Sequence, residues 1–268
     1  MGYRTKKTFH FNAGVPRSGN TLLSALLNQN LKVYSGPLSP VLHVMGHTQD
    51  IFCDEESAAF PKPETFSRII SNVITEYYAD RPEEIIIDKA RKWPAYVDII
   101  ERYITKTPKI ICTMRKPIEI ISSFIQLIHS SPIGPSFVDK RLVEAKVPIT
   151  DEYRCDYIFK SLSVSFDAIA TAYKNNHFRH IQFVDYDELV AAPKEVMLKI
   201  HSFLELDAFD YDFNNIERTY WEKDLEVYNL PHMHDVRSTI SRTSKHYSEV
   251  LSNDMVKSYE NFSFLPPK

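Results

Sequence analysis

Short apolar runs alternate along the chain with longer segments in which apolar residues recur every three or four positions. Five runs rich in β-branched or aromatic residues predict strands at residues 8–13, 32–35, 84–87, 109–114 and 180–185. Residues 85–87 and 110–112 are continuously apolar, as expected for strands that a parallel sheet buries on both faces. The runs therefore predict a central parallel sheet.

Helical patterns fill the intervals between the predicted strands. The first, at residues 18–29, carries leucines at positions 22, 23, 26 and 27, which form one apolar stripe. Similar patterns predict helices at residues 64–78, 93–103, 118–128, 152–175, 193–204 and 249–261. The alternation of strand and helix predicts a three-layer α/β/α fold in a single domain over residues 1–268. Ligands of such folds bind beyond the carboxyl ends of the strands.

Three segments interrupt this alternation. Residues 46–63 contain a cluster of acidic side chains and predict a surface loop, and residues 129–150 predict a long loop or lid. Residues 207–245 are rich in aromatic, histidine and basic side chains. Long loops at the ligand end of a sheet are where we expect the choice of substrate to be made.

The charge balance and the cysteine content exclude several classes of protein. The chain has 32 Lys and Arg against 35 Asp and Glu, a formal net charge of −3, which predicts no general nucleic-acid or membrane-surface binding. Its three cysteines are far apart, which argues against a disulfide framework and a structural zinc site. No window approaches the roughly 18–20 apolar residues of a membrane span. We therefore expect a cytoplasmic protein with no nucleic-acid or membrane partner.

A glycine-containing loop joins the first predicted strand to the leucine-striped helix. Its sequence, GVPRSGNT over residues 14–21, has the form G-x-x-x-x-G-x-T. The glycines let backbone amides turn inward, and the helix N-terminus offers unpaired N–H groups to an anion. An ATP-binding loop has lysine after the second glycine, where this chain has Asn20, and here Arg17 supplies the positive charge. The loop favours a 5′-phosphate over a triphosphate; the alternative is an ordinary turn before a helix.

The segment PRSG-x-TLL after a first strand resembles the 5′-phosphosulfate loop of sulfotransferases that use 3′-phosphoadenosine 5′-phosphosulfate (PAPS). Its arginine is similar to the tyrosylprotein and bacterial branches of that family. The resemblance implies a P-loop-containing nucleotide-hydrolase-like sulfotransferase fold. It also implies that the donor contacts Arg17, Ser18, Gly19, Asn20, Thr21 and Leu22.

A second motif of this family binds the 3′-phosphate of the donor. The family places an arginine at the end of a strand and a serine eight residues later in the next helix, which matches Arg115 and Ser123. A guanidinium can bind a phosphate through two parallel hydrogen bonds, and a hydroxyl in the helix can add another. The alternative is that Arg115 forms a surface ion pair with Glu119.

Lys89 follows a buried strand and resembles the strand-end lysine of the family. The resemblance implies that it neutralises charge on the sulfuryl group and on the leaving oxygen. A lysine at this position is a point charge suited to an oxyanion. The preceding Asp88 keeps an alternative open, because an acidic strand end could hold Mg²⁺ in a nucleotide-dependent kinase.

Two later segments resemble further family motifs. FVDYDELV at residues 183–190 is similar to a segment whose tyrosine reaches the donor, which implies that role for Tyr186. Residues 234–242 resemble the segment that folds over the nucleotide, which implies contacts from Arg237 and Ser238. Each segment is also compatible with an ordinary strand end or surface.

The attacking hydroxyl group needs a general base with a pKa near neutrality. The tyrosylprotein enzymes have a glutamate after the second strand, whereas residues 35–43 of this chain contain no carboxylate. His43 is the nearest titratable candidate. The missing glutamate predicts a small-molecule or glycan hydroxyl acceptor rather than a protein tyrosine.

These observations predict a sulfotransferase that moves a sulfuryl group from PAPS to a hydroxyl or amine by in-line displacement and releases 3′-phosphoadenosine 5′-phosphate (PAP). Arg17, Lys89 and the loop amides would stabilise the transferring group, with His43 as the base and without a metal ion. Two alternatives remain open. One is a P-loop small-molecule kinase that uses Mg²⁺ and ATP, and the other is a nucleotide-binding module without catalysis.

Overall fold

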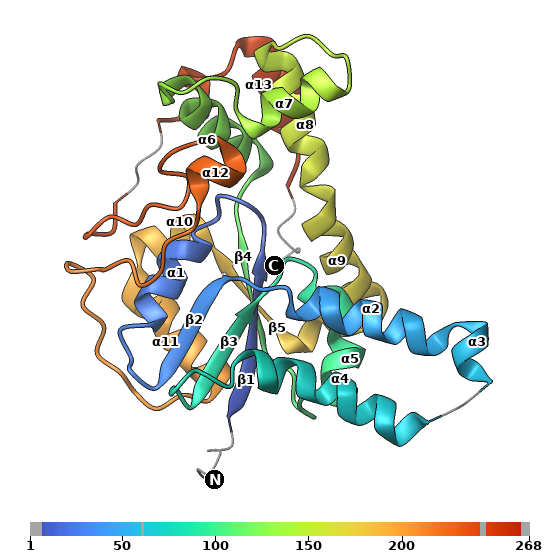
Figure 1. Ribbon diagram of the computed structural model, residues 1–268. Helices are drawn as coiled ribbons and strands as arrows, with labels where there is room; N and C mark the ends of the chain where they lie inside the picture. The colour runs from blue at the N-terminus through green and yellow to red at the C-terminus, as the bar shows by residue number, and fades with distance from the viewer. Residues whose placement is uncertain (1–6, 60–61, 242–244, 264–268) are drawn as a thin grey trace.

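A five-stranded sheet, all parallel, forms the centre of the protein; the computed structural model describes residues 7–59, 62–241 and 245–263. The strand order is β2-β3-β1-β4-β5 (Figure 1). The strands are β1 (Thr8–Gly14), β2 (Val33–Leu38), β3 (Ile85–Lys89), β4 (Ile110–Met114) and β5 (Ile181–Asp185). Parallel neighbours require crossover connections, and helices supply them here, so the predicted α/β/α fold class is confirmed.

Each strand sends alternate residues to opposite faces of the sheet, and two hydrophobic cores result. Ile86 packs in one core with Phe11, while the next residue, Ile87, packs in the other with Ile111. This double burial is why the strands are continuously apolar. The second core is covered by α1 (Asn20–Leu27), α10 (Tyr186–Ala191) and α11 (Pro193–Leu204). The first is covered by α2 (Val41–Cys53), α4 (Pro63–Tyr77), α5 (Val97–Tyr103), α6 (Pro117–Ser130), α8 (Asp151–Ser161) and α9 (Ser163–Lys174).

The register of the sheet brings the carboxyl ends of its strands together at one edge. Asn12 pairs with Lys89, and Gly14 pairs with Thr113. In Figure 1 this edge is at the upper end of the sheet, below α6 and α12 (Asp224–Tyr228). Residues that are far apart in the sequence therefore meet where ligands of parallel sheets bind.

The prediction of a surface loop at residues 46–63 is wrong. Most of this segment belongs to α2, and a short helix, α3 (Glu55–Ala58), follows it. Met45 is fully buried, and the ring centroids of Phe52 and Phe66 lie 4.8 Å apart. Packing against α4 stabilises a helix that the local composition did not predict.

Two other predicted segments differ from the structure in detail. Residues 129–150 are not only a loop, because they contain α7 (Phe137–Glu144), which begins at a capping box. The helix predicted at residues 152–175 is interrupted at Leu162, where a backbone bond to the third preceding residue tightens the turn. The remaining elements are 3₁₀ turns at Trp93–Tyr96, Phe178–His180 and Tyr247–Glu249 and helix α13 (Asn253–Tyr259). Within the described ranges, no helix combines the length and the apolarity needed to cross a membrane.

After α11 the chain crosses back over the carboxyl edge of the sheet. We call residues 205–241 the return segment; it contains α12 and is otherwise irregular. Asn28 Nδ2 donates to Thr219 Oγ1 at 2.6 Å, and the side chain of Gln29 exchanges two hydrogen bonds of 2.8 Å with the backbone of Asp212. These contacts fasten the return segment to the C-terminal end of α1, the end opposite the loop that follows β1.

Candidate active site

The loop between β1 and α1 needs glycine at two positions. Gly14 has a φ of 136° and Gly19 a φ of 85°, in the region that favours glycine. A Cβ atom on Gly14 would lie 2.4 Å from the carbonyl oxygen of Thr113, and one on Gly19 would lie 2.9 Å from the ring of Tyr186. The two glycines therefore allow the loop to pack against β4 and α10.

Polar side chains within the loop bond to its own backbone. The buried Ser18 Oγ donates to the carbonyl oxygen of Val15 at 2.5 Å and lies 2.6 Å from Thr113 Oγ1. Asn20 Nδ2 lies 3.4 Å from both the Val15 carbonyl oxygen and Ser18 Oγ. The residue at the lysine position of an ATP-binding loop is thus directed back at the loop itself.

A cavity of about 440 Å³ lies over this loop at the carboxyl edge of the sheet. We call it the first cavity, and the return segment forms its opposite wall. Predicted site residues that line it are Arg17, Gly19, Asn20, Thr21, Leu22, Lys89, Arg115, Ser123, Tyr186 and Arg237. Of the other predicted residues, which all lie in the described part of the chain, Ser18 and Ser238 do not line this cavity, and His43 lines a neighbouring one.

Arg17 connects the loop to two other segments. Its Nε donates to Ser123 Oγ of α6 at 3.2 Å, and one terminal nitrogen donates to the carbonyl oxygen of Met233 in the return segment. Burial, reinforced by the positive charge of Arg115, lowers the pKa of Arg17. An anion in the first cavity would compensate both the burial and the repulsion.

Arg115 follows the end of β4 and is held in one orientation. Its Nε lies 3.3 Å from Glu119 Oε2, a terminal nitrogen donates to the Arg17 carbonyl oxygen at 3.0 Å, and its guanidinium lies 4.4 Å from the ring centroid of Tyr186. The ion pair with Glu119 that we considered as an alternative does form, but it is buried. Because Arg115 also lines the first cavity, the ion pair and an anion-binding role are compatible.

Lys89 and Asp88 end β3 and point to opposite sides of the sheet. Lys89 lines the first cavity, and burial lowers the pKa of its ammonium group. Asp88 is fully buried and accepts hydrogen bonds from Ser39 Oγ at 2.5 Å and from Tyr78 OH and Trp93 Nε1 at 2.7 Å each. Burial raises the pKa of the Asp88 carboxyl. Its oxygens are satisfied by protein donors, so Asp88 has a structural role.

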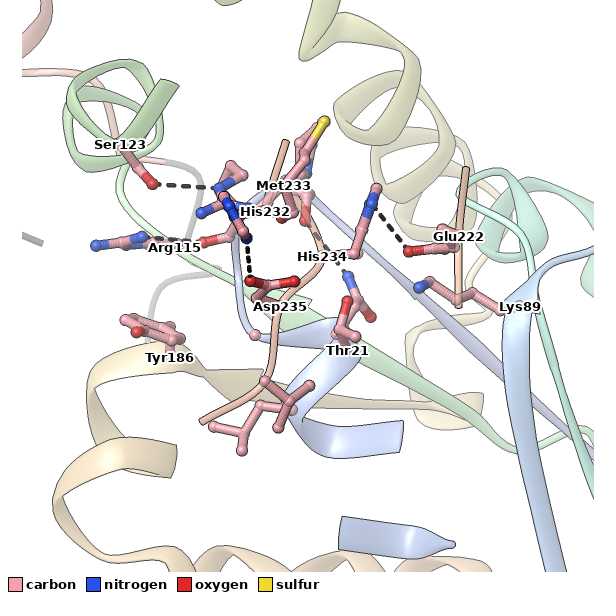
Figure 2. A pocket seen from close by; sticks show the side chains of 18 of the residues that line it. Thr21, Lys89, Arg115, Ser123, Tyr186, Glu222, His232, Met233, His234 and Asp235 are labelled. Atoms are coloured by element: carbon pink, nitrogen blue, oxygen red, sulfur yellow. Dashed lines mark hydrogen bonds and ion pairs between the residues drawn. The ribbon is translucent and has the colours of Figure 1, made fainter. Parts of the chain in front are cut away.

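The return segment brings a cluster of three titratable side chains to the first cavity. His234 Nδ1 lies 2.5 Å from Asp224 Oδ1 and 2.9 Å from Glu222 Oε2. Figure 2 shows His234 directed at Glu222, with Lys89 beside them. Our sequence reasoning missed this cluster, because its only signal was the concentration of histidine and acidic residues in an aperiodic segment. The three ligand atoms lie within 4.8 Å of one another, a spacing that a metal ion could also bridge, so metal-free chemistry stays a prediction.

A second cavity of about 400 Å³ adjoins the first. The two share Pro16, Leu38, Arg91, Tyr228 and Met233. The walls of the second cavity are mainly apolar and aromatic, with side chains that include Leu42, Phe124, Phe137, Tyr157 and Val164. His43, exposed on α2, is one of its few titratable lining residues.

The sheet order, the loop after β1 and the cationic side chains above it define a P-loop-like α/β protein. The profile of the sulfotransferase family matches residues 11–211, which is most of the chain, and the chain belongs to this family. No curated protein sequence matches it.

Solved structures agree with this assignment at the level of the fold. The sulfotransferase domain of the Synechococcus PCC 7002 olefin synthase is 17% identical, with a TM-score of 0.52 over 100% of this chain and 92% of that domain. The sulfotransferase domain of the curacin biosynthetic pathway is 15% identical, with a TM-score of 0.52 over 98% of this chain and 94% of that domain. Both extend the similarity over nearly the whole length of each chain.

Proposed function

We propose that the chain moves a sulfuryl group from PAPS to a hydroxyl or amine acceptor and releases PAP. The observation that carries this proposal is the hydrogen-bonded contact of Arg17 with Ser123 and of Arg115 with Arg17 around one cavity. These residues come from two predicted phosphate motifs that lie far apart in the sequence. A nucleotide with separate 5′ and 3′ anionic groups matches two adjacent cationic sites.

In this proposal the donor lies along the first cavity. Its 3′-phosphate binds Arg115 and Ser123, and Tyr186, whose ring packs on Arg115, contacts the nucleotide. Arg237, which lines the cavity, covers the nucleotide from the return segment, and Ser238 follows it outside the cavity wall. The 5′-phosphosulfate lies at the N-terminus of α1, on the backbone amides of Arg17, Ser18, Gly19, Asn20, Thr21 and Leu22 and on the side chains of Arg17 and Thr21.

Two features favour this donor over Mg²⁺ and ATP. Asn20 directs its amide at the Val15 carbonyl oxygen, where an ATP-binding loop offers a lysine to the phosphates. The oxygens of Asp88, the candidate magnesium ligand, already accept three hydrogen bonds. Lys89 favours catalysis over binding alone, because it lines the cavity beside the loop where the transferring group would lie.

Sulfuryl transfer depends on positioning and charge stabilisation more than on covalent participation by the protein. The acceptor oxygen attacks sulfur in line with the bond to the bridging oxygen of PAP, and that bond breaks. Lys89, Arg17 and the loop amides stabilise the sulfuryl oxygens and the leaving phosphate. The proposal assigns this positive charge to the protein's own groups rather than to a metal ion.

The second cavity is the entry for the acceptor in this proposal. It meets the first cavity at Tyr228 and Met233, and its apolar walls suit the hydroxyl of an apolar small molecule. His43 lines this cavity and not the one that holds Lys89. It is the base candidate that the sequence alone offers.

Calorimetric titration with PAP, ADP and Mg²⁺–ATP tests the donor. We expect PAP to bind at least tenfold more tightly than the other two, a gap of about 1.4 kcal/mol. Preference for Mg²⁺–ATP would contradict the proposal and favour the kinase alternative. The matching activity measurement is PAP release from PAPS in the presence of simple phenols and alcohols.

A further inference from the structure

We propose that Glu222 is the general base that accepts the proton of the attacking hydroxyl, an assignment that rests on the proposed function. Glu222 belongs to the return segment and lines the first cavity beside Lys89 (Figure 2). Its charge acts on Lys89 and on Tyr228, and Tyr228 lines both cavities. The carboxylate therefore lies near the junction where an acceptor would meet the sulfur.

Two neighbouring side chains hold Glu222 in place. Asp224 accepts the backbone N–H of His234 through Oδ2 at 2.9 Å and the imidazole Nδ1 through Oδ1 at 2.5 Å. These two contacts orient the imidazole and use its single Nδ1–H, so Glu222 Oε2 faces the same nitrogen at 2.9 Å without a hydrogen bond of its own. Asp224 and His234 are thus positioning residues, and Glu222 keeps its other oxygen for the acceptor.

The charges around Glu222 keep it ionised. The titratable groups that face it are His234, Lys89, Arg218, Tyr220, Tyr228 and, through His234, Asp224. Burial opposes ionisation, but the imidazole of His234 and the charges of Lys89 and Arg218 hold the pKa of Glu222 below its ordinary value. When Lys89 pairs with the sulfuryl oxygens, less of its charge acts on Glu222, so the carboxylate becomes more basic as transfer begins.

Glu222 fits the role better than His43 does. His43 is exposed on α2, lines only the second cavity and, among the described residues, has no hydrogen-bond partner to orient it. The cluster also fits a shared proton better than a metal ion. Nitrogen and oxygen ligands of a tetrahedral zinc ion are separated by about 3.3 Å, whereas His234 Nδ1 and Asp224 Oδ1 lie 2.5 Å apart.

The proton and the electrons balance in a single displacement. As the acceptor oxygen bonds to sulfur, its proton moves to Glu222. The bond from sulfur to the bridging oxygen of PAP breaks, and its electron pair stays on the leaving phosphate. Arg17, in the loop after β1, donates to the carbonyl oxygen of Met233, the residue before His234. This bond connects that loop to the return segment, which carries Glu222. Glu222 releases the proton to solvent when the products leave.

Glu222→Gln tests the assignment, with Glu226→Gln as the matched control. Glu226 lies in the same segment but is exposed and pairs with Lys223 at 2.9 Å. The assay measures PAP release from PAPS with substituted phenols and with water as acceptors, together with PAP affinity. We expect Glu222→Gln to lower kcat by about 10²–10⁴-fold and to leave PAP affinity within about twofold, which also shows that the variant is folded. Glu226→Gln should keep kcat within about twofold.

The pH profile distinguishes a base from a merely structural group. Because Glu222 is ionised over this range, wild-type kcat with a phenol should be level from about pH 5 to 8, whereas in Glu222→Gln it should rise with pH until the phenol itself ionises. Glu222→Asp should retain the wild-type profile at a lower rate. The assignment would be overturned by full activity of Glu222→Gln or by a loss of activity found only with His43→Gln. It would also be overturned by inactivation with EDTA that Zn²⁺ reverses. Wild-type protein that neither binds PAP nor releases it from PAPS would overturn the proposed function, and this assignment with it.

Discussion

Replacement of Asp88 distinguishes a structural carboxylate from a magnesium ligand. Asp88→Ala removes the common acceptor of Ser39 Oγ, Tyr78 OH and Trp93 Nε1, which lie 2.5, 2.7 and 2.7 Å from its oxygens. Each buried donor left without a partner costs about 1–3 kcal/mol. Loss of the buried charge offsets part of this, so we expect the free energy of unfolding to fall by roughly 3–6 kcal/mol. That is a large share of the 5–15 kcal/mol that stabilises a typical domain.

Asp88→Asn is the informative variant, because it should fold. The amide oxygen can accept from the Trp93 indole and the amide nitrogen can donate to the hydroxyls, so we expect a loss of about 1–2 kcal/mol. The measurement is urea unfolding followed by tryptophan fluorescence, and Trp93 is one of only two tryptophans in the chain. Since Asp88 does not line the first cavity, PAP affinity should stay at the wild-type value. An Asn variant with unchanged stability and lost Mg²⁺–ATP binding would refute this reasoning.

Three further changes test the site and the core. Lys89→Ala should lower kcat by about 10²–10³-fold with PAP affinity within about tenfold, and unchanged activity would show that Lys89 does not act on the transferring group. Arg115→Ala should weaken PAP by about 10–100-fold and ADP far less; equal losses would contradict binding of the 3′-phosphate. Burial lowers the pKa of His10 from 6.5 to about 4, so between these values the unfolded chain binds a proton that the folded chain does not. Stability should therefore fall, by up to about 3 kcal/mol, as the pH drops through this window, and urea unfolding of His10→Leu should lack that loss.

Much of the fold could be predicted because its signals are local. A strand buried on both faces is continuously apolar, as the three isoleucines that begin β3 show. A helix with one buried face shows a stripe of leucines. The loop after β1 was predictable for the same reason, since both glycines of residues 14–19 serve a backbone conformation set within the loop and its nearest neighbours.

Helix α2 and Asp88 show where local signals end. The acidic composition near Asp50 suggested a loop, yet burial of Met45 and packing of Phe52 against Phe66 make the segment helical. A strand-end aspartate has the same sequence signature whether it binds a metal ion or accepts bonds from Ser39, Tyr78 and Trp93. Only the positions of those donors, in other elements, distinguish the two roles.

By itself the sequence determined the parallel α/β architecture, the glycine-containing loop after β1 and the places of Arg17 and Arg115 beyond the ends of strands, since each depends on residues close together in the chain. Tertiary structure alone decided that Arg115 both pairs with Glu119 and lines the first cavity. It also decided that the return segment carries Glu222 to Lys89. The physical reason is that an irregular segment has no periodicity to predict its path, so its side chains are placed only by contacts such as those from the end of α1 and from Arg17.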